Sequence, residues 1–184
     1  MNSNESADDS TNPPGLAASD HVTGNPAARV TLVEYGDYEC PRCAQAQAAV
    51  HLLLDAYGDR LRFVYRHYPD VDAHPHSELA AEAAEAAAAQ GKFWEMHALL
   101  FNDALHLGEE TIVRDAATIG LDTARLRAEL AGHVHLQRVR EQHAAAARLR
   151  LRGTPGFFLD DVPVDVSYSL QNLEQSVRAA LGEA

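Results

Sequence analysis

Both cysteines of the chain lie in one Cys-Pro-Arg-Cys unit, residues 40–43, at a point where an apolar strand gives way to a helix. The preceding segment 29–35, RVTLVEY, alternates apolar side chains and contains β-branched residues, which predicts a buried strand. Pro41 suits the first turn of a helix, because its φ is already helical and an N–H there would lack an intrahelical partner. A helix over 44–57 and a second strand over 61–68 follow. The two thiols therefore lie inside a βαβ unit.

The rest of the chain is mostly helical and returns to strand structure near its end. Alanine-rich and amphipathic segments separated by glycines predict a folded helical block rather than a linker. The expected helices of this block are 77–90, 92–102, 109–119, 123–130 and 134–151. Two short strands, 157–159 and 162–166, flank an Asp-Asp turn, and a last amphipathic helix covers 170–181. We expect one α/β domain over 21–184, ordered βαβ, helical insert (69–152), ββα, behind a disordered tail, 1–20.

Charge and composition exclude several classes of function. The 184 residues carry a formal charge of −12, whereas a nucleic-acid footprint or an anionic membrane surface calls for a basic patch. No segment reaches the roughly 18 apolar residues of a membrane span, so we expect no membrane insertion. The first 20 residues lack the basic and apolar regions of a secretory signal. As given, the chain is expected to be cytoplasmic, and extracytoplasmic if an export signal has been removed.

Two thiols at this spacing suit a zinc site, a structural disulfide or a redox dithiol. Zinc usually takes four ligands, and none of the ten histidines lies at a finger-like spacing from Cys43. A structural disulfide is rare in the cytosol and would constrain little over three residues. A thiolate at a helix N-terminus is stabilised by the helix dipole and free N–H groups. We therefore expect a redox pair with Cys40 as nucleophile and Cys43 as resolving thiol, and no metal.

The residues around the pair bear on its redox direction. Arg42 is always cationic and should favour a Cys40 thiolate, together with the preorganising Pro41. Asp37 and Glu39 act against it. A low pKa would stabilise the reduced form and make the disulfide oxidising.

The sequence resembles the DsbA-like branch of the thioredoxin superfamily over residues 21–184. The CPRC unit follows a hydrophobic strand, Glu34 lies six positions before Cys40, Gly153-Thr154-Pro155 precedes a strand, and a helical insert separates the two halves. The stretch from Arg66 to Phe101 is similar to single-domain DsbA family proteins and to thioredoxin-like domains fused to bacterial sodium–proton antiporters.

The resemblance implies a thioredoxin fold and several site residues. Glu34 would be a buried acid that assists proton transfer at the second thiol. Pro155 would be a cis-proline, and Thr154 would offer backbone hydrogen bonds to an extended substrate strand. The redox-active disulfide would be the only cofactor. Glu39, Arg42 and Gly156 depart from common family patterns, which leaves the redox direction open.

Other notable residues have plainer interpretations. His67, His74 and His76 form a candidate metal cluster, although capping or solvated roles are commoner. Phe93 and Trp94 are expected in the core rather than in a peptide groove. The acidic helix face formed by Glu78, Glu82 and Glu85 is expected to be a solvated surface.

The sequence thus predicts a thiol–disulfide oxidoreductase acting on protein, peptide or small-molecule disulfides with an unidentified thiol partner. Reductase or isomerase chemistry is expected in the cytosol, and oxidase chemistry if the protein is exported. The alternatives are a non-catalytic thioredoxin-like redox-sensing or binding domain and a glutathione-transferase-like relative. The intact CxxC disfavours the second of these.

Overall fold

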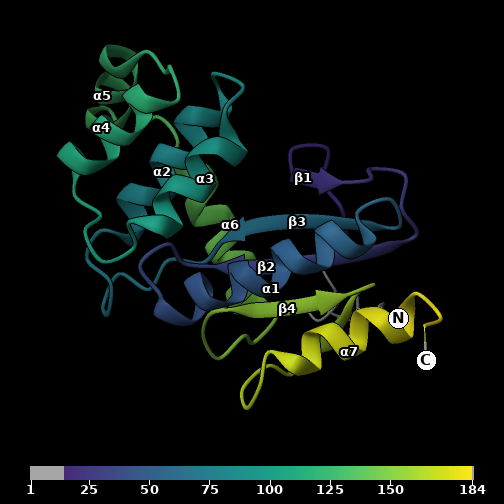
Figure 1. The fold of residues 1–184 in the computed structure, drawn as a ribbon. Helices are drawn as coiled ribbons and strands as arrows, with labels where there is room; N and C mark the ends of the chain where they lie inside the picture. Colours follow the sequence, from purple (N-terminus) through teal and green to yellow (C-terminus); the bar gives the residue numbers. More distant parts are fainter. Residues whose placement is uncertain (1–14, 184) are drawn as a thin grey trace, which may run out of the picture.

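The computed structural model describes residues 15–183, which form a five-stranded sheet flanked by helices (Figure 1). The strands are β1 (His21–Gly24), β2 (Val30–Gly36), β3 (Leu61–His67), β4 (Gly156–Leu159) and β5 (Val162–Val164). The helices are α1 (Pro41–Tyr57), α2 (Ser77–Ala88), α3 (Phe93–Asn102), α4 (Glu109–Thr118), α5 (Thr123–Ala131), α6 (Leu136–Arg148) and α7 (Gln171–Ala180). The expected strands and helices are all present, with their ends shifted by a few residues.

The sheet has the strand order β1-β3-β2-β4-β5. The pair β2 and β3 is parallel, as the βαβ prediction requires, and the other neighbours are antiparallel. The Asp-Asp turn joins β4 to β5 with positive φ at both Asp160 and Asp161, the geometry that matches the twist of a tight hairpin. The predicted α/β thioredoxin fold with a helical insert is confirmed.

Alternation along the central strand β2 decides which side chains face the site. Leu32 packs into the main core, whereas Val33 and Tyr35 belong to a smaller cluster on the other face. Because successive side chains point to opposite faces, Glu34 faces the same side as Leu32. Both faces are covered, and all seven residues of β2 are buried.

The helices cover the two faces unequally. Apolar residues of α1 and α7 join the main core, and Ala146 of α6 joins the smaller cluster on the opposite face. The helices α2 to α6 lie between β3 and β4 in the chain, and α2 to α5 form the lobe at the upper left of Figure 1. The N-terminal end of α1 points toward this lobe, so the CPRC unit lies where the lobe meets the sheet.

Two features near the N-terminus were not predicted. The short strand β1 adds an edge to the sheet through antiparallel pairing with β3. The side chain of Arg66 on β3 binds both carboxylate oxygens of Asp20 and the carbonyl oxygen of Gly15. Asp20 is therefore held in a largely buried ion pair, so residues just before His21 contact the sheet. The remainder of the predicted tail, residues 1–14, lies outside the described residues.

The acidic face of α2 is not the solvated surface that the sequence suggested. Glu82 and Glu85 are buried, at 1% and 4% exposure. Glu85 bonds to His21 and His67 and forms an ion pair with Arg138 of α6. These partners come from three different elements, which is why the pattern of α2 alone could not reveal them. In the described part of the chain, no helix has both the length and the apolar character needed to cross a membrane.

Candidate active site

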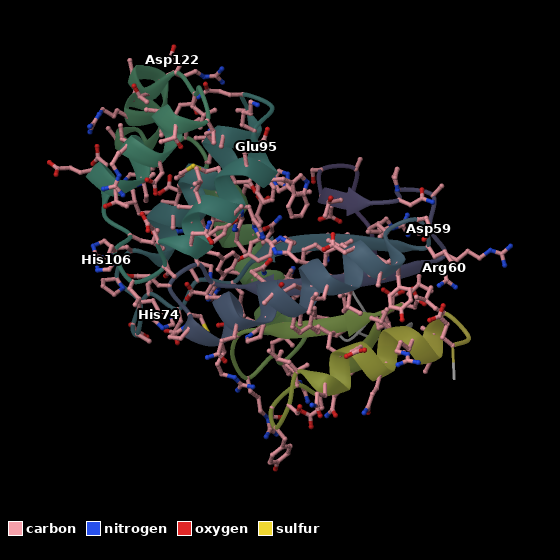
Figure 2. All side chains as sticks on the ribbon, in the orientation of Figure 1. Asp59, Arg60, His74, Glu95, His106 and Asp122 are labelled. Carbon is pink, nitrogen blue, oxygen red and sulfur yellow. The ribbon has the colours of Figure 1, made fainter. Side chains whose placement is uncertain are left out.

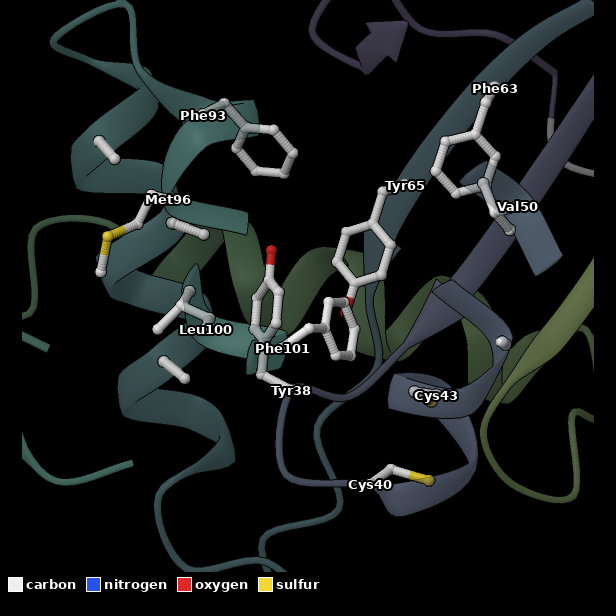
Figure 3. Close-up of a cluster of buried hydrophobic side chains, with 14 of the residues drawn as sticks. Tyr38, Cys40, Cys43, Val50, Phe63, Tyr65, Phe93, Met96, Leu100 and Phe101 are labelled. Atoms are coloured by element: carbon white, nitrogen blue, oxygen red, sulfur yellow. The ribbon is translucent and has the colours of Figure 1, made fainter. Parts of the chain in front are cut away.

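The two cysteines occupy the first turn of α1. Cys40 is the N-cap residue with an extended backbone, Pro41 takes the first helical position, and the Ala44 N–H donates to the Cys40 carbonyl at 3.1 Å. Cys43 then lies three residues inside the helix and belongs to the main core (Figure 3). Both thiols are free. The sequence therefore places one sulfur at the helix end and the second one turn further in.

Cys40 has the more reactive thiol. It is 6% exposed, against 0% for Cys43. Its pKa is lowered to about 5, chiefly by a hydrogen bond from the Cys43 thiol. Burial opposes this shift, while the Thr154 side chain and the backbone N–H groups of Cys43 and Arg42 reinforce it. These N–H groups are free donors at the helix start, so the sulfur at position 40 is a thiolate at neutral pH.

Cys43 has the opposite character. Burial raises its pKa well above the ordinary value, and the hydrogen bond to Cys40 together with the nearby Glu34 carboxyl adds to the effect. The Asp37 backbone N–H donates to the Cys43 sulfur at 3.5 Å. A protonated, shielded thiol beside a thiolate is the arrangement that a resolving cysteine requires.

The cis-proline loop lies against Cys40. The Thr154–Pro155 peptide bond is cis, as the resemblance implied, and the Cys40 sulfur lies 3.5 Å from the Thr154 carbonyl oxygen. A cavity of about 250 Å³ adjoins the loop, lined on one side by residues 151–157 and on the other by Arg42 and residues 163–167. Gly156 closely approaches Leu151, because a Cβ at position 156 would lie 2.8 Å from that side chain.

The Arg42 side chain does not lie where the sequence argument put it. Its guanidinium donates to the carbonyl oxygens of Val166 at 2.8 Å and Ser167 at 3.3 Å, in the segment before α7. The backbone N–H of Arg42, rather than its guanidinium, contributes to the lowered pKa of Cys40. Arg42 therefore joins the CPRC turn to the far wall of the cavity.

Glu34 is fully buried beneath α1. Burial raises its pKa to about 8, although a hydrogen bond from the Gln47 amide acts in the opposite direction. The charge on Cys40 adds to the rise. One carboxyl oxygen accepts from Gln47 at 3.0 Å, and the other has no protein partner among the described residues. Glu34 can thus change its protonation state near neutral pH, beside the thiol pair.

The acids that precede Cys40 are paired with histidines of the insert. Asp37 bonds to His74 Nδ1 at 2.7 Å, and Glu39 bonds to His76 Nδ1 at 3.0 Å. Burial of His74 acts against protonation, but the Asp37 carboxylate outweighs it and the pKa of His74 is raised. Figure 2 shows His74 beside the N-terminal end of α1. These pairs tie the loop before the CPRC unit to the start of α2.

The third histidine of the predicted cluster is elsewhere. His67 is buried against Glu85, apart from the two pairs above. Among residues 15–183, no group of three or more potential ligands is arranged to hold a metal ion. Phe93 and Trp94 pack in and against the main core, as predicted.

Sequence reasoning missed Gln47, His97 and Tyr38, which connect to Glu34. Gln47 lies one turn after Cys43 on the buried face of α1, and His97 lies on the buried face of α3. A polar residue on an apolar helix face was the available signal. The pattern alone does not tell which buried polar side chains meet.

Known proteins resemble this chain in sequence over most of its length. The family model described as Thioredoxin matches residues 17–179. The sodium–proton antiporter NhaA 3 of Salinispora tropica is 42% identical over 90% of this chain, and NhaA of Herminiimonas arsenicoxydans is 37% identical over 91%. The chain spans only about a quarter of the length of these two relatives, 25% and 27%.

Solved structures extend the comparison. A thioredoxin-like oxidoreductase from Silicibacter pomeroyi is 34% identical, with a TM-score of 0.79 and coverage of 91% of this chain and 95% of that one. BdbD from Bacillus subtilis, 20% identical, shares the fold with a TM-score of 0.83 over 94% and 97% of the two chains. With its CPRC turn, cis-proline loop and helical insert, the chain therefore belongs to the thioredoxin family, and its fold is that of DsbA-like structures.

Proposed function

We propose that the protein catalyses thiol–disulfide exchange with protein substrates, and that the Cys40–Cys43 disulfide acts as the oxidant. The observation that carries this proposal is the pairing of a Cys40 thiolate, whose pKa is lowered to about 5, with a shielded Cys43 thiol. A thiolate stabilised in the reduced protein makes the reduced form more favourable, so the disulfide accepts electrons readily. The similarity to the Silicibacter oxidoreductase supports redox chemistry.

Oxidation of a substrate dithiol proceeds in two balanced steps. A substrate thiolate attacks the Cys40 sulfur, the Cys40–Cys43 bond breaks, and Cys43 leaves as a thiolate that takes up a proton. The second substrate thiol, as thiolate, then attacks the substrate sulfur of the mixed disulfide and expels the Cys40 thiolate. The substrate loses two electrons and gains a disulfide, and Cys40 and Cys43 gain the two electrons. No group besides the disulfide is needed.

The surrounding residues have roles in these steps. Glu34 exchanges the proton of Cys43, since it lies beside that thiol with a pKa of about 8. Thr154 and the cavity beyond Pro155 hold an extended segment of the substrate near Cys40. An oxidant of this kind suits a compartment outside the reducing cytosol, and reductase or isomerase activity would suit the cytosol.

Trapping of the mixed disulfide tests this proposal. The Cys43→Ser variant, mixed with a disulfide-bonded peptide, should accumulate a peptide adduct on Cys40 that is visible by mass spectrometry of the intact protein. The matched Cys40→Ser variant should form none. The oxidised wild-type protein should also convert a reduced two-cysteine protein to its disulfide, with loss of two hydrogens.

A non-catalytic redox-sensing or binding domain is the competing function. It would show neither an adduct in the Cys43→Ser variant nor substrate oxidation by the wild-type protein. An adduct together with reduction, rather than oxidation, of the substrate would keep the exchange chemistry and reverse the proposed direction.

A further inference from the structure

A chain of hydrogen bonds leads from Glu34 away from the thiols into the helical insert. The Gln47 amide Nε2 donates to Glu34 Oε2 at 3.0 Å, and Gln47 Oε1 lies 3.1 Å from His97 Nε2. His97 Nδ1 lies 3.0 Å from the Tyr38 hydroxyl. These four side chains come from β2, α1, α3 and the loop before Cys40, and all are buried. Figure 3 shows Tyr38 among the rings of Tyr65, Phe93 and Phe101.

Glu34, at one end of this series of hydrogen bonds, determines which groups along it donate and which accept. A Glu34 carboxylate can only accept, so the Gln47 N–H group points toward it and the Gln47 oxygen points toward His97. That oxygen needs a donor, which makes Nε2 of His97 the protonated nitrogen. Nδ1 is then an acceptor for the Tyr38 hydroxyl. Burial keeps the pKa of His97 well below its ordinary value, so the ring is neutral and has one proton to place.

We propose that His97 is a positioning residue for thiol–disulfide exchange: it locks the Gln47 amide with its N–H toward Glu34 and thereby favours the proton-accepting carboxylate beside Cys43. This inference rests on the proposed function and adds a regulator of its proton step. These hydrogen bonds fix the orientation of the Gln47 amide and do not conduct a proton, since an amide does not readily pass one on. Tyr38 completes the arrangement by occupying the other His97 nitrogen.

The physical effect depends on which end of the Gln47 amide faces Glu34. The N–H end stabilises the carboxylate, and the oxygen end stabilises only the protonated acid. Without a partner at position 97, the amide is free to present either end. The carboxylate would then be populated less at neutral pH, and removal of the Cys43 proton would require higher pH.

Other titratable groups also act on Glu34. The thiols Cys40 and Cys43 face it from α1, and the phenols Tyr38 and Tyr65 couple to it from the loop and from β3. On β4, Phe157 is opposite Glu34 and uncharged. The imidazoles that influence His97 are His21, His51 and His67. All of these groups remain in place when His97 is replaced, so the effect of His97 can be isolated.

His51 provides a matched control for His97. It lines the same two cavities, of about 130 and 240 Å³, together with Gln47 and His97. His51 forms no hydrogen bond within the described part of the chain. A His51→Phe substitution therefore alters the same region with the same exchange of side chains and leaves the hydrogen-bond chain intact.

The test is an NMR titration of the Glu34 carboxyl carbon in the reduced full-length protein. Loss of a hydrogen bond to a charged group should raise the Glu34 pKa by about 1–2 units in Gln47→Leu, with a smaller rise in His97→Phe. The His51→Phe variant should titrate like wild type. In the double variant, His97→Phe should add nothing to Gln47→Leu, because its effect acts through Gln47. An unchanged Glu34 pKa in folded His97→Phe, or additive shifts, would overturn the inference.

A second measurement needs no variant. Nitrogen chemical shifts of His97 in the reduced wild-type protein above the Glu34 pKa should report a neutral ring with its proton on Nε2. A proton on Nδ1 would overturn the inference even if His97→Phe fails to fold. Both readouts are independent of turnover, so they are separable from failure of the proposed activity. If exchange occurs, Cys43 should resolve a Cys40 mixed disulfide with a pH dependence that is shifted to higher pH in His97→Phe. This shift should match the rise of the Glu34 pKa.

Discussion

The thiol of Cys43 should be the main cause of the acidity of Cys40. We predict that Cys43→Ala raises the Cys40 pKa from about 5, because the substitution removes the hydrogen bond that lowers it most. A hydrogen bond to a charged group contributes about 1.5–3 kcal/mol, and one pKa unit corresponds to about 1.36 kcal/mol. The expected rise is therefore about 1–2 units.

Ultraviolet absorbance of the thiolate measures this shift directly, because Cys40 is the only remaining cysteine in the variant. Arg42→Leu is the matched comparison. It should leave the Cys40 pKa nearly unchanged, since the guanidinium binds the carbonyls of Val166 and Ser167 and the backbone N–H is retained. A Cys40 pKa near 5 in Cys43→Ala, or a large rise in Arg42→Leu, would refute the reasoning.

Three further predictions concern stability. The folded-state pKa of Cys40 is below its ordinary value, so ionisation of this thiol should add about 2–3 kcal/mol to the stability of the reduced protein at pH 7, an increment that Cys40→Ala lacks. This advantage should vanish as the pH falls through about 5, and denaturant unfolding of the two proteins that shows no such loss would contradict the assignment. Gly36→Ala should lower the free energy of unfolding by about 1–3 kcal/mol, because the new Cβ would lie 2.6 Å from the buried Tyr65 ring. A melting temperature equal to that of the wild-type protein would exclude this clash. Glu85→Ala should cost about 3–5 kcal/mol, because it leaves the buried His67 and the part-buried His21 and Arg138 without their shared carboxylate. Replacement of the exposed Glu95 by alanine should cost almost nothing, and similar losses in both variants would show that burial of Glu85 is unimportant.

Local sequence patterns were sufficient to predict the strand and the helix that carry the candidate site. Alternation along β2 places Glu34 on the face that carries Leu32, and the helix that starts at Pro41 covers that face. The cis-proline loop could be located because Thr154 and Pro155 matched a family motif, and the cis bond itself was implied only by that resemblance.

The rest depends on contacts between distant segments. The Arg42 side chain ends at Val166, 124 residues away, so neighbouring residues gave no indication of its direction. Gln47 and His97 are each recognisable as polar residues on a buried helix face, but their meeting depends on how α1 packs against α3. The strand β1 is only four residues long and exists through its pairing with β3, which a local pattern does not report.

The reduction potential of the Cys40–Cys43 pair, measured by equilibration with glutathione, tests the central claim most directly. The lowered pKa of Cys40 predicts reversible formation of one disulfide with a potential of about −120 to −180 mV, in the range of oxidases and isomerases. A potential near about −270 mV, the range of thioredoxin-type reductants, would contradict the oxidant assignment. Failure to form a reversible disulfide at any glutathione ratio would contradict thiol–disulfide exchange itself.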